Sequence, residues 1–185
     1  MMSKRIVIIS TSPRRNSNSE ALANAFAKGA AESGNDVEVI SLRGKDMRFC
    51  LGCFACQKTG KCVIKDDMNE IVLKMEQADV LVFATPIYYY EMSGQMKTLL
   101  DRANPLFVSD YRFRDVYFLS SAAEDEDFVP QRAQSGLEGW IECFEKAHLT
   151  GSVFGGGVTD VGEIKGHHAL EEAYEVGEVR RCAGE

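Results

Sequence analysis

The chain has 185 residues and a formal net charge of −7, with 45% hydrophobic and 26% charged residues. This is ordinary globular composition, and the length predicts a single domain over residues 1–185. The negative charge argues against nucleic acid or an anionic membrane as a partner. The sequence lacks an apolar run of about eighteen residues and a signal peptide, so we expect a cytoplasmic protein without membrane contact.

Short apolar runs alternate along the chain with longer segments of helical periodicity. Leu22, Phe26 and Ala30, for example, recur at helical spacing and are followed by Gly34, a typical residue after a helix end. We expect strands at 4–10, 36–42, 79–84, 115–120 and 148–154, and helices at 18–33, 67–77, 94–103, 130–146 and 167–181. Thr85-Pro86 is expected to end the third strand.

Five strands separated by helices predict a parallel sheet with right-handed crossovers and helices on both faces. Ligands of such sheets bind beyond the carboxyl ends of the strands, near the point where the strand order reverses. The loops after the first, third and fourth strands are therefore the places to search for a site. The late run Gly155-Gly156-Gly157 is expected to be a turn at a strand end, or a place of close approach to a partner subunit.

The loop after the first strand is rich in hydroxyl and amide side chains. It reads S-T-S-P-R-R-N-S-N-S over residues 10–19 and runs into the first helix. The free N–H groups of a helix start, with hydroxyls and arginines beside them, can bind a phosphate. The loop has neither the glycines of a dinucleotide fingerprint nor the Lys of a Walker loop. A simple capping loop is the alternative, since Ser and Asn cap helices in every kind of protein.

The loop after the third strand contains three consecutive tyrosines, Tyr88, Tyr89 and Tyr90. A tyrosine has an apolar body and a polar tip, which suits a partly wet pocket for a flat aromatic ligand. The alternative is a turn whose tyrosines cover the sheet edge or a subunit interface. Further on, Lys97, Asp101 and Arg102 are expected to have structural roles at a helix surface or an interface.

Together the two loops resemble those of the NADPH-dependent FMN reductase group of the flavodoxin superfamily. The resemblance rests on S-x-P-R-x-x-S-N-S after strand one, T-P-I-Y-Y-Y-x-x-x-S-G-x-x-K after strand three and the helix end L-L-D-R, and it covers about residues 4–104. It implies a flavodoxin-like three-layer α/β/α sandwich whose five parallel strands have the order 2-1-3-4-5. It also implies FMN as the cofactor and NAD(P)H as the electron donor.

The resemblance also assigns the flavin site. The first loop would hold the FMN phosphate, and the second loop would line the isoalloxazine ring. The loop after strand four would approach the ring from the other side, although its continuation, residues 124–127, is more acidic than the family pattern. The residues expected to bind FMN are Ser12, Arg14, Ser17, Asn18, Ser19, Pro86, Ile87, Tyr88, Tyr89 and Ser121.

Four cysteines lie close together in an irregular insertion at about residues 43–65. Their spacing is C-x2-C-x2-C-x5-C, from Cys50 through Cys53 and Cys56 to Cys62. The first three match the bacterial ferredoxin run, and four thiolates suit a [4Fe–4S] cluster, whereas zinc usually pairs its ligands over a longer span. A redox dithiol of Cys53 and Cys56, or four reduced thiols packed under the loop, are the alternatives.

The cysteine motif resembles that of the iron–sulfur flavoproteins, a branch of the same superfamily. There the motif lies between the second strand and the following helix, and its cluster exchanges electrons with the flavin of a neighbouring subunit. The resemblance therefore implies Cys50, Cys53, Cys56 and Cys62 as cluster ligands and a homodimer or homotetramer. Cys143 and Cys182 fall in expected helices and are interpreted as structural, and the three histidines show no metal-ligand pattern.

The preferred function is an FMN-dependent oxidoreductase that takes electrons from NAD(P)H and passes them to a small acceptor, such as a quinone or a flavin. The cofactor supplies the chemistry, so no side-chain acid or base is expected. The alternative is an iron–sulfur flavoprotein that transfers electrons between protein partners, with a ferredoxin-like redox partner. A sensor of redox state or metal on the same fold, without flavin, is a third hypothesis.

Overall fold

The computed structural model describes residues 3–179. Its sheet has five parallel strands in the order β2-β1-β3-β5-β6, and a short sixth strand, β4, pairs with β3 alone. The strands are β1 (Arg5–Ser10), β2 (Asp36–Ser41), β3 (Val80–Tyr88), β4 (Glu91–Met92), β5 (Asp115–Ser121) and β6 (His148–Gly155). The predicted order of the parallel strands is confirmed, because β4 enters the numbering without entering the parallel sheet.

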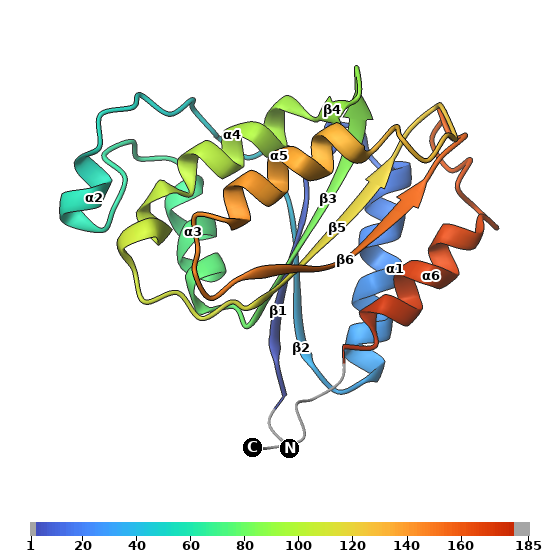
Figure 1. Cartoon of the computed structure of the whole chain (residues 1–185), viewed down its shortest axis with the longest axis horizontal. Helices are drawn as coiled ribbons and strands as arrows, with labels where there is room; N and C mark the ends of the chain where they lie inside the picture. The colour runs from blue at the N-terminus through green and yellow to red at the C-terminus, as the bar shows by residue number, and fades with distance from the viewer. Residues whose placement is uncertain (1–2, 180–185) are drawn as a thin grey trace.

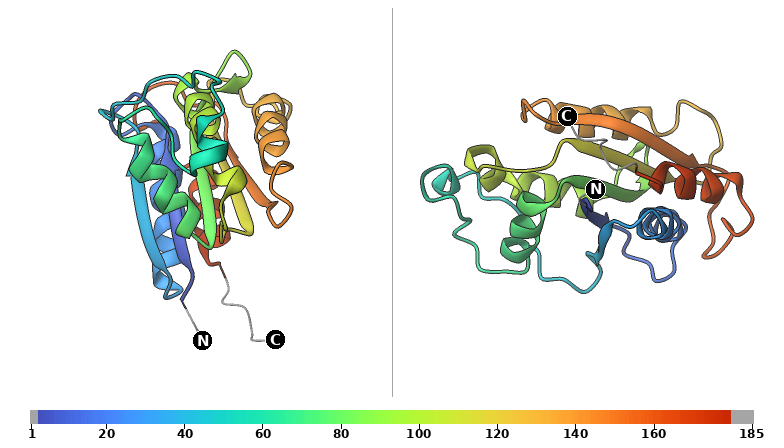
Figure 2. Two further views of the ribbon diagram at one scale, coloured as in Figure 1. Left: turned by 90° about the vertical axis from the view of Figure 1, so that its left-hand side faces the viewer. Right: turned by 90° about the horizontal axis from the view of Figure 1, so that it is seen from below.

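Helices cover both faces of the sheet, which gives three layers (Figures 1 and 2). One face packs against α1 (Asn18–Glu32) and α6 (His168–Gly177), through a core that includes Ile8, Phe26 and Ala173. The other packs against α3 (Met68–Gln77), α4 (Gly94–Arg102) and α5 (Gln131–Ile141), through Met75, Phe83 and Leu99 among others. The predicted α/β/α sandwich is therefore confirmed, and it arises because the strands present apolar side chains to both faces.

The third strand is longer than predicted. It continues through Thr85-Pro86 to Tyr88 and turns back through the hairpin partner β4, with Tyr88 opposite Glu91. The expectation that Pro86 ends the strand was wrong. β1 pairs with β3 only as far as Ala84 and β4 pairs with it only from Ile87, so Pro86 lies in the gap between them, while it stays in register with Ser121 of β5. Proline is tolerated where a strand edge needs no donor.

Two boundaries near the end of the chain also differ from the predictions. α5 ends at Ile141, where tight turns follow, so Cys143 lies beyond the helix with an exposed side chain. Its interpretation as a structural residue was wrong, because Phe144 rather than Cys143 enters the core. α6 ends at Gly177, four residues before the predicted end, and Cys182 lies outside the described residues.

The insertion between β2 and α3 is mostly irregular, as predicted. It contains one short helix, α2 (Ala55–Thr59). Further along the chain, a 3₁₀ helix, η1 (Asn104–Val108), follows directly after α4. The insertion extends beyond the edge of the sandwich at the end of α4 (Figure 1).

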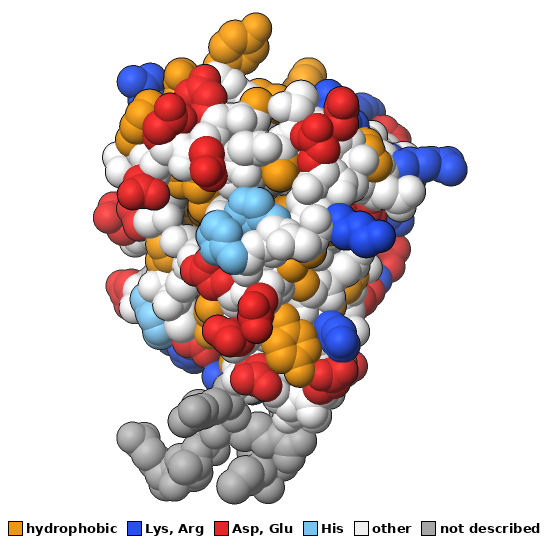
Figure 3. Space-filling model, turned by 90° about the vertical axis from the view of Figure 1, so that its right-hand side faces the viewer, with side chains coloured by type: hydrophobic (Ala, Val, Ile, Leu, Met, Phe, Trp, Pro, Cys, Tyr) orange, Lys and Arg blue, Asp and Glu red, His pale blue; other side chains and the backbone are white. Residues whose placement is uncertain are grey.

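The surface reflects the acidic composition. Asp and Glu side chains are spread over the face shown in Figure 3, with Lys and Arg gathered mainly along one side. Within residues 3–179, no helix has the length and apolar character needed to cross a membrane.

Candidate functional site

Three buried hydroxyls, of Thr11, Thr85 and Ser93, connect the loop after β1 with the end of β3 and the start of α4, near the point where the strand order reverses. Ser93 Oγ lies 3.0 Å from Thr11 Oγ1 and accepts from Thr85 Oγ1 at 3.2 Å. Thr11 Oγ1 also bonds the carbonyl of Ala84 at 3.1 Å, and all three hydroxyl residues have no exposed surface. Buried polar groups need such partners, and these bonds fix the connected segments relative to each other.

The start of α1 forms a polar pocket above this network. Ser17 is the N-cap, and its Oγ accepts from the backbone N–H of Glu20 at 3.1 Å. Ser17 Oγ lies 3.4 Å from Ser19 Oγ, and Ser12 Oγ accepts from the Arg14 N–H at 3.2 Å. The first N–H groups of a helix have no partner within the helix and carry partial positive charge, which favours an anion at this end.

A cavity of about 150 Å³ lies where these loops meet. Its polar side is formed by the loop after β1 and its apolar side by Pro86 and Ile87 at the end of β3, while the loop after β5 closes the third side. Of the ten predicted flavin-binding residues, all but Ser19 and Tyr89 line it: Ser12, Arg14, Ser17, Asn18, Pro86, Ile87, Tyr88 and Ser121.

The two predicted residues outside this cavity have different surroundings. Ser19 is fully buried in the first turn of α1, next to Ser17. The Tyr89 side chain is 97% exposed and lines a neighbouring cavity of about 480 Å³. That second cavity shares Ile87, Tyr88, Ala122 and Ala123 with the first, so the two lie side by side at the end of β3.

The loop after β6 completes the first cavity with Val158, Thr159 and Val161, which the sequence analysis did not identify. Arg14 Nη1 donates to the carbonyl of Thr159 at 2.9 Å, and Asn18 Nδ2 donates to that of Asp160 at 3.0 Å. Arg14 and Asn18 therefore also position this loop. The only signal in the sequence was the glycine run before it.

That glycine run allows a close approach between two loops of one chain. A Cβ on Gly156 would come within 2.6 Å of the Asp125 Cα, and the N–H of Val158 donates to the carbonyl of Ala122 at 2.9 Å. Glu163 then closes the loop by accepting from the N–H groups of Thr159 and Asp160, which lowers the pKa of its carboxyl group. The loops after β5 and β6 thus support each other beside the cavity.

The tyrosine turn faces the acidic loop across the second cavity. The Tyr90 hydroxyl donates to the Glu124 carboxylate, with oxygen–oxygen distances of 3.0 and 3.2 Å. This bond is the largest contribution that raises the pKa of Tyr90, so the phenol stays protonated. Glu124 is part of the acidic segment that departs from the family pattern, and here it holds the turn of the β3–β4 hairpin.

The four cysteines of the insertion line a separate cavity of about 320 Å³ at the end of α4. Cys50 and Cys53 are exposed, Cys62 is half-buried and Cys56 is buried. Two N–H groups point at sulfur: Asn104 Nδ2 donates to Cys56 Sγ at 3.1 Å, and the Gly52 N–H to Cys50 Sγ at 3.4 Å. Among residues 3–179, however, no three Cys, His, Asp or Glu side chains converge closely enough to hold a metal ion.

Arg102 is not at the helix surface, contrary to expectation. Its side chain is fully buried and forms a two-pronged ion pair with the equally buried Asp66, with the shortest nitrogen–oxygen distance 2.6 Å. The sequence alone did not indicate this buried pair, because Asp66 and Arg102 are far apart along the chain. Lys97 and Asp101, in contrast, form an exposed ion pair on α4, as a surface role predicts.

Comparison with known proteins places the chain in a family. Residues 4–154 match the profile of NADPH-dependent FMN reductases. An iron–sulfur flavoprotein of Methanocaldococcus jannaschii is 40% identical over 102 residues, which cover 55% of this chain and 53% of that protein. The match thus spans about half the length of that relative.

Solved structures of other oxidoreductases share the fold. An NAD(P)H:quinone oxidoreductase from Methanothermobacter marburgensis superposes with a TM-score of 0.70 at 17% identity, over 96% of both chains. An FMN-dependent NADH-azoreductase from Bacillus anthracis in complex with FMN gives 0.66 at 15% identity, over 94% of this chain and 97% of that one. The profile match, which covers most of the chain, shows that the protein belongs to the NADPH-dependent FMN reductase family of oxidoreductases.

Proposed function

We propose that the chain binds FMN in the cavity at the carboxyl ends of β1, β3 and β5 and uses it to pass electrons from NAD(P)H to a small acceptor, such as a quinone or a flavin. The observation that carries this proposal is the composition of the cavity. One end combines a helix start, hydroxyls and Arg14, and the other has apolar walls from Pro86 and Ile87. A molecule with a phosphate at one end and a flat ring at the other matches both.

The side chains would divide the binding as follows. Ser12, Ser17 and the free N–H groups of α1 would hold the phosphate, with Arg14 supplying charge. Pro86, Ile87 and Tyr88 would contact the ring, and Ser121 with its alanine neighbours would approach it from the opposite side. When bound, FMN supplies hydride and electron transfer, whereas the protein supplies orientation and exclusion of water.

The second cavity is the candidate place for the nicotinamide and the acceptor. It adjoins the first, with which it shares Ile87 and Tyr88, and is bounded by Tyr89, Tyr90 and Glu124. Tyrosine rings offer flat apolar surfaces for stacking. The hydrogen bond between Tyr90 and Glu124 fixes one wall of this space.

The flavin site is tested by replacing Arg14 and Ser17 together with alanine. The removal of a charged donor and of the N-cap should weaken FMN binding by about tenfold or more, since a hydrogen bond to a charged group contributes roughly 1.5–3 kcal/mol. Flavin fluorescence titration and the flavin content of the purified protein measure the effect. Arg15→Ala is the matched control, because Arg15 is an exposed neighbour that does not line the cavity. Unchanged FMN content in the double variant would refute the assignment.

We further propose that Cys50, Cys53, Cys56 and Cys62 hold a [4Fe–4S] cluster. The supporting observation is that all four line one cavity, with N–H donors directed at two of the sulfurs. Its remaining walls are largely apolar, with Leu51, Phe54 and Ile64 among them, and apolar surroundings suit a thiolate-bound cluster, although Leu51 and Phe54 are exposed here. The donor set and its surroundings fit such a cluster, although binding requires the four sulfurs to move closer together.

Anaerobic purification with iron and sulfide analysis tests this second proposal. We expect about four irons per chain, with flavin bands in the absorption spectrum, as four cysteine ligands require. Cys53→Ser should lose most of the iron and keep the flavin. Cys143→Ser, which changes an exposed cysteine outside the motif, should retain both. Flavin without iron in the unmodified protein would leave the four residues as thiols and the protein as an FMN reductase alone.

A further inference from the structure

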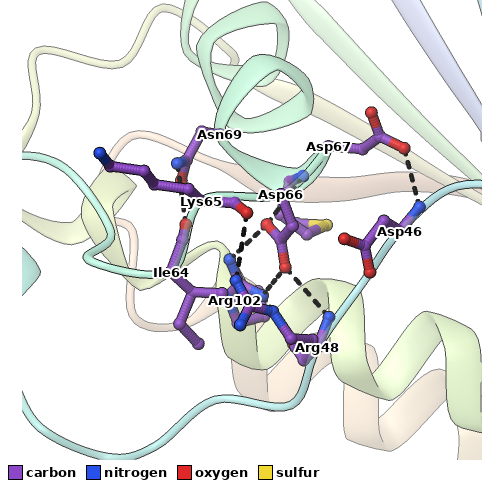
Figure 4. A network of polar contacts seen from close by, with 9 residues as sticks. Asp46, Arg48, Ile64, Lys65, Asp66, Asp67, Asn69 and Arg102 are labelled. Atoms are coloured by element: carbon purple, nitrogen blue, oxygen red, sulfur yellow. Dashed lines mark hydrogen bonds and ion pairs between the residues drawn. The ribbon is translucent and has the colours of Figure 1, made fainter.

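The cysteine loop, residues 48–66, is joined at its two ends by a narrow neck (Figure 4). The N–H of Arg48 donates to Asp66 Oδ2 at 3.0 Å, and Arg48 Nη2 donates to the carbonyl of Lys65 at 3.1 Å. Just outside, Asp46 and Asp67 exchange two further bonds, at 2.8 and 3.1 Å. The two ends of the loop therefore lie side by side, and the four cysteines lie between them.

Arg102, the last residue of α4, attaches this neck to the body of the protein. Its Nη1 donates to the carbonyl of Arg48 and to Asp66 Oδ2, both at 2.6 Å, and its Nη2 to Asp66 Oδ1 at 2.8 Å. One guanidinium group thus contacts both ends of the loop. A fully buried ion pair contributes little net stability compared with apolar side chains of the same size, so specificity of structure is the better explanation for its presence here.

The guanidinium group of Arg102 has one nitrogen that these bonds do not use. Asp66 makes the largest contribution, through its hydrogen bonds, to the raised pKa of Arg102. The buried Nε of Arg102 has no hydrogen-bond partner among the described residues. A buried donor without an acceptor is costly, so the bonds from the other two nitrogens to the neck must hold the guanidinium group in place.

We propose that Arg102 is the positioning residue of the four-cysteine site: it fastens both ends of the cysteine loop to α4. The loop is thereby held with its thiols around one cavity before any cluster binds. The role toward a cluster rests on the iron–sulfur proposal above, whereas the fastening of the loop does not.

The first test measures loop opening in the full chain with FMN bound and iron removed. The double variant Asp66→Leu/Arg102→Met replaces the pair by apolar side chains and leaves no unpaired buried charge. Alkylation by iodoacetamide, followed by peptide mass spectrometry, gives the rate for each cysteine. We expect Cys56, which is buried, to react about tenfold faster or more once the neck opens. Cys50 and Cys53 are already exposed and should change little.

Three controls make the result specific. Arg102→Lys keeps the charge but loses the two parallel N–H donors, so the alkylation rate of Cys56 in this variant should lie between those of the unmodified protein and the double variant. The same variant replaces the double variant if the latter does not fold. Arg112→Met disrupts a mostly exposed arginine–aspartate pair and should leave the rate unchanged. An unchanged Cys56 rate in the variants of Arg102, or an equal rise in Arg112→Met, would overturn the proposal.

The second test uses the iron-loaded protein. Extraction of iron by a chelator should be roughly 10- to 100-fold faster in the double variant, the range found when residues supporting metal ligands are changed. FMN content should stay constant. Equal extraction rates would overturn the role of Arg102 toward the cluster. If the unmodified protein binds no iron while Cys56 is still protected by Arg102, the iron–sulfur proposal fails and the fastening of the loop stands.

Discussion

At the scale of single residues, the tyrosine turn carries backbone strain. Tyr89 and Tyr90 form the two-residue turn between β3 and β4, with φ values of 52° and 65°. Such turns favour Asn-Gly because side chains with a Cβ are crowded in the left-handed region. Strain of this kind persists where the surrounding structure holds it, and it is often found at functional sites. The turn lies at the edge of the second cavity, where a tyrosine ring can stack against a bound ligand.

Tyr89→Asn should therefore make the protein more stable and less active. Asparagine tolerates positive φ, and the Tyr89 ring is 97% exposed, so little packing is lost. We expect the free energy of unfolding to rise by about 0.5–1 kcal/mol in urea titrations, part of the usual cost of the left-handed region. Turnover of NAD(P)H with a quinone should fall.

Tyr90→Asn is the matched comparison for this prediction. It occupies the same backbone region, but its ring lies 6.0 Å from that of Phe128 and its hydroxyl bonds Glu124. That variant should not gain stability, because the lost contacts oppose the relief of strain. A Tyr89→Asn protein that unfolds at lower urea than the unmodified chain would show that the turn is not strained.

At the scale of elements, α4 connects the two candidate sites. Its N-cap, Ser93, belongs to the buried hydroxyl network beneath the flavin cavity, and its last residue, Arg102, holds the cysteine loop. Nine residues of α-helix span roughly 14 Å, so the two sites are fixed at the two ends of one short rigid element. A change in the position of α4 would therefore alter both sites together.

The elements themselves could be predicted from local patterns. The helical spacing of Leu22, Phe26 and Ala30 predicts α1, and these residues are fully buried in the structure. Most of the lining of the candidate flavin cavity was also predictable, because the carboxyl ends of neighbouring parallel strands meet at one edge and the family resemblance named residues in those loops. The end of β3 could not be predicted in this way, because proline is tolerated at position 86 only since the pairing of β1 with β3 stops at Ala84.

The residues missed by sequence analysis depend on distant partners. Thr159, which lines the candidate flavin cavity, and the neighbouring Asp160 accept hydrogen bonds from Arg14 and Asn18, which lie near the other end of the chain. Arg102 reads as a surface residue of an amphipathic helix until Asp66 is placed beside it. No local pattern in the sequence indicates the contact between the loops after β1 and β6 or the pair of Arg102 with Asp66.

At the scale of the whole molecule, stability at low pH reports on the buried ion pair. Arg102 and the backbone N–H of Arg48 lower the pKa of Asp66 below its usual value of 3.8. A carboxyl group with a lowered pKa in the folded state stabilises the fold above its unfolded pKa, and this contribution disappears as the pH falls through the folded pKa. The other carboxyl groups are mostly exposed, so few of them have comparable effects.

Asp66→Asn should accordingly destabilise the protein in a pH-dependent way. Near neutral pH the variant leaves Arg102 as a buried charge without a counterion, which should lower the free energy of unfolding by about 3–5 kcal/mol. As the pH falls below 3.8, Asp66 becomes protonated in the unfolded chain first and in the folded protein only at its lower pKa, so the difference between the two proteins should shrink over this range. Urea titrations at a series of pH values measure this difference. Asp79→Asn, which disrupts the more exposed pair with Arg112, should cost less. The difference in free energy of unfolding between Asp66→Asn and the unmodified chain could instead stay constant down to the lowest pH. That result would mean that the charge of Asp66 does not stabilise the fold, and that the buried pair acts only through the packing and shape of its side chains.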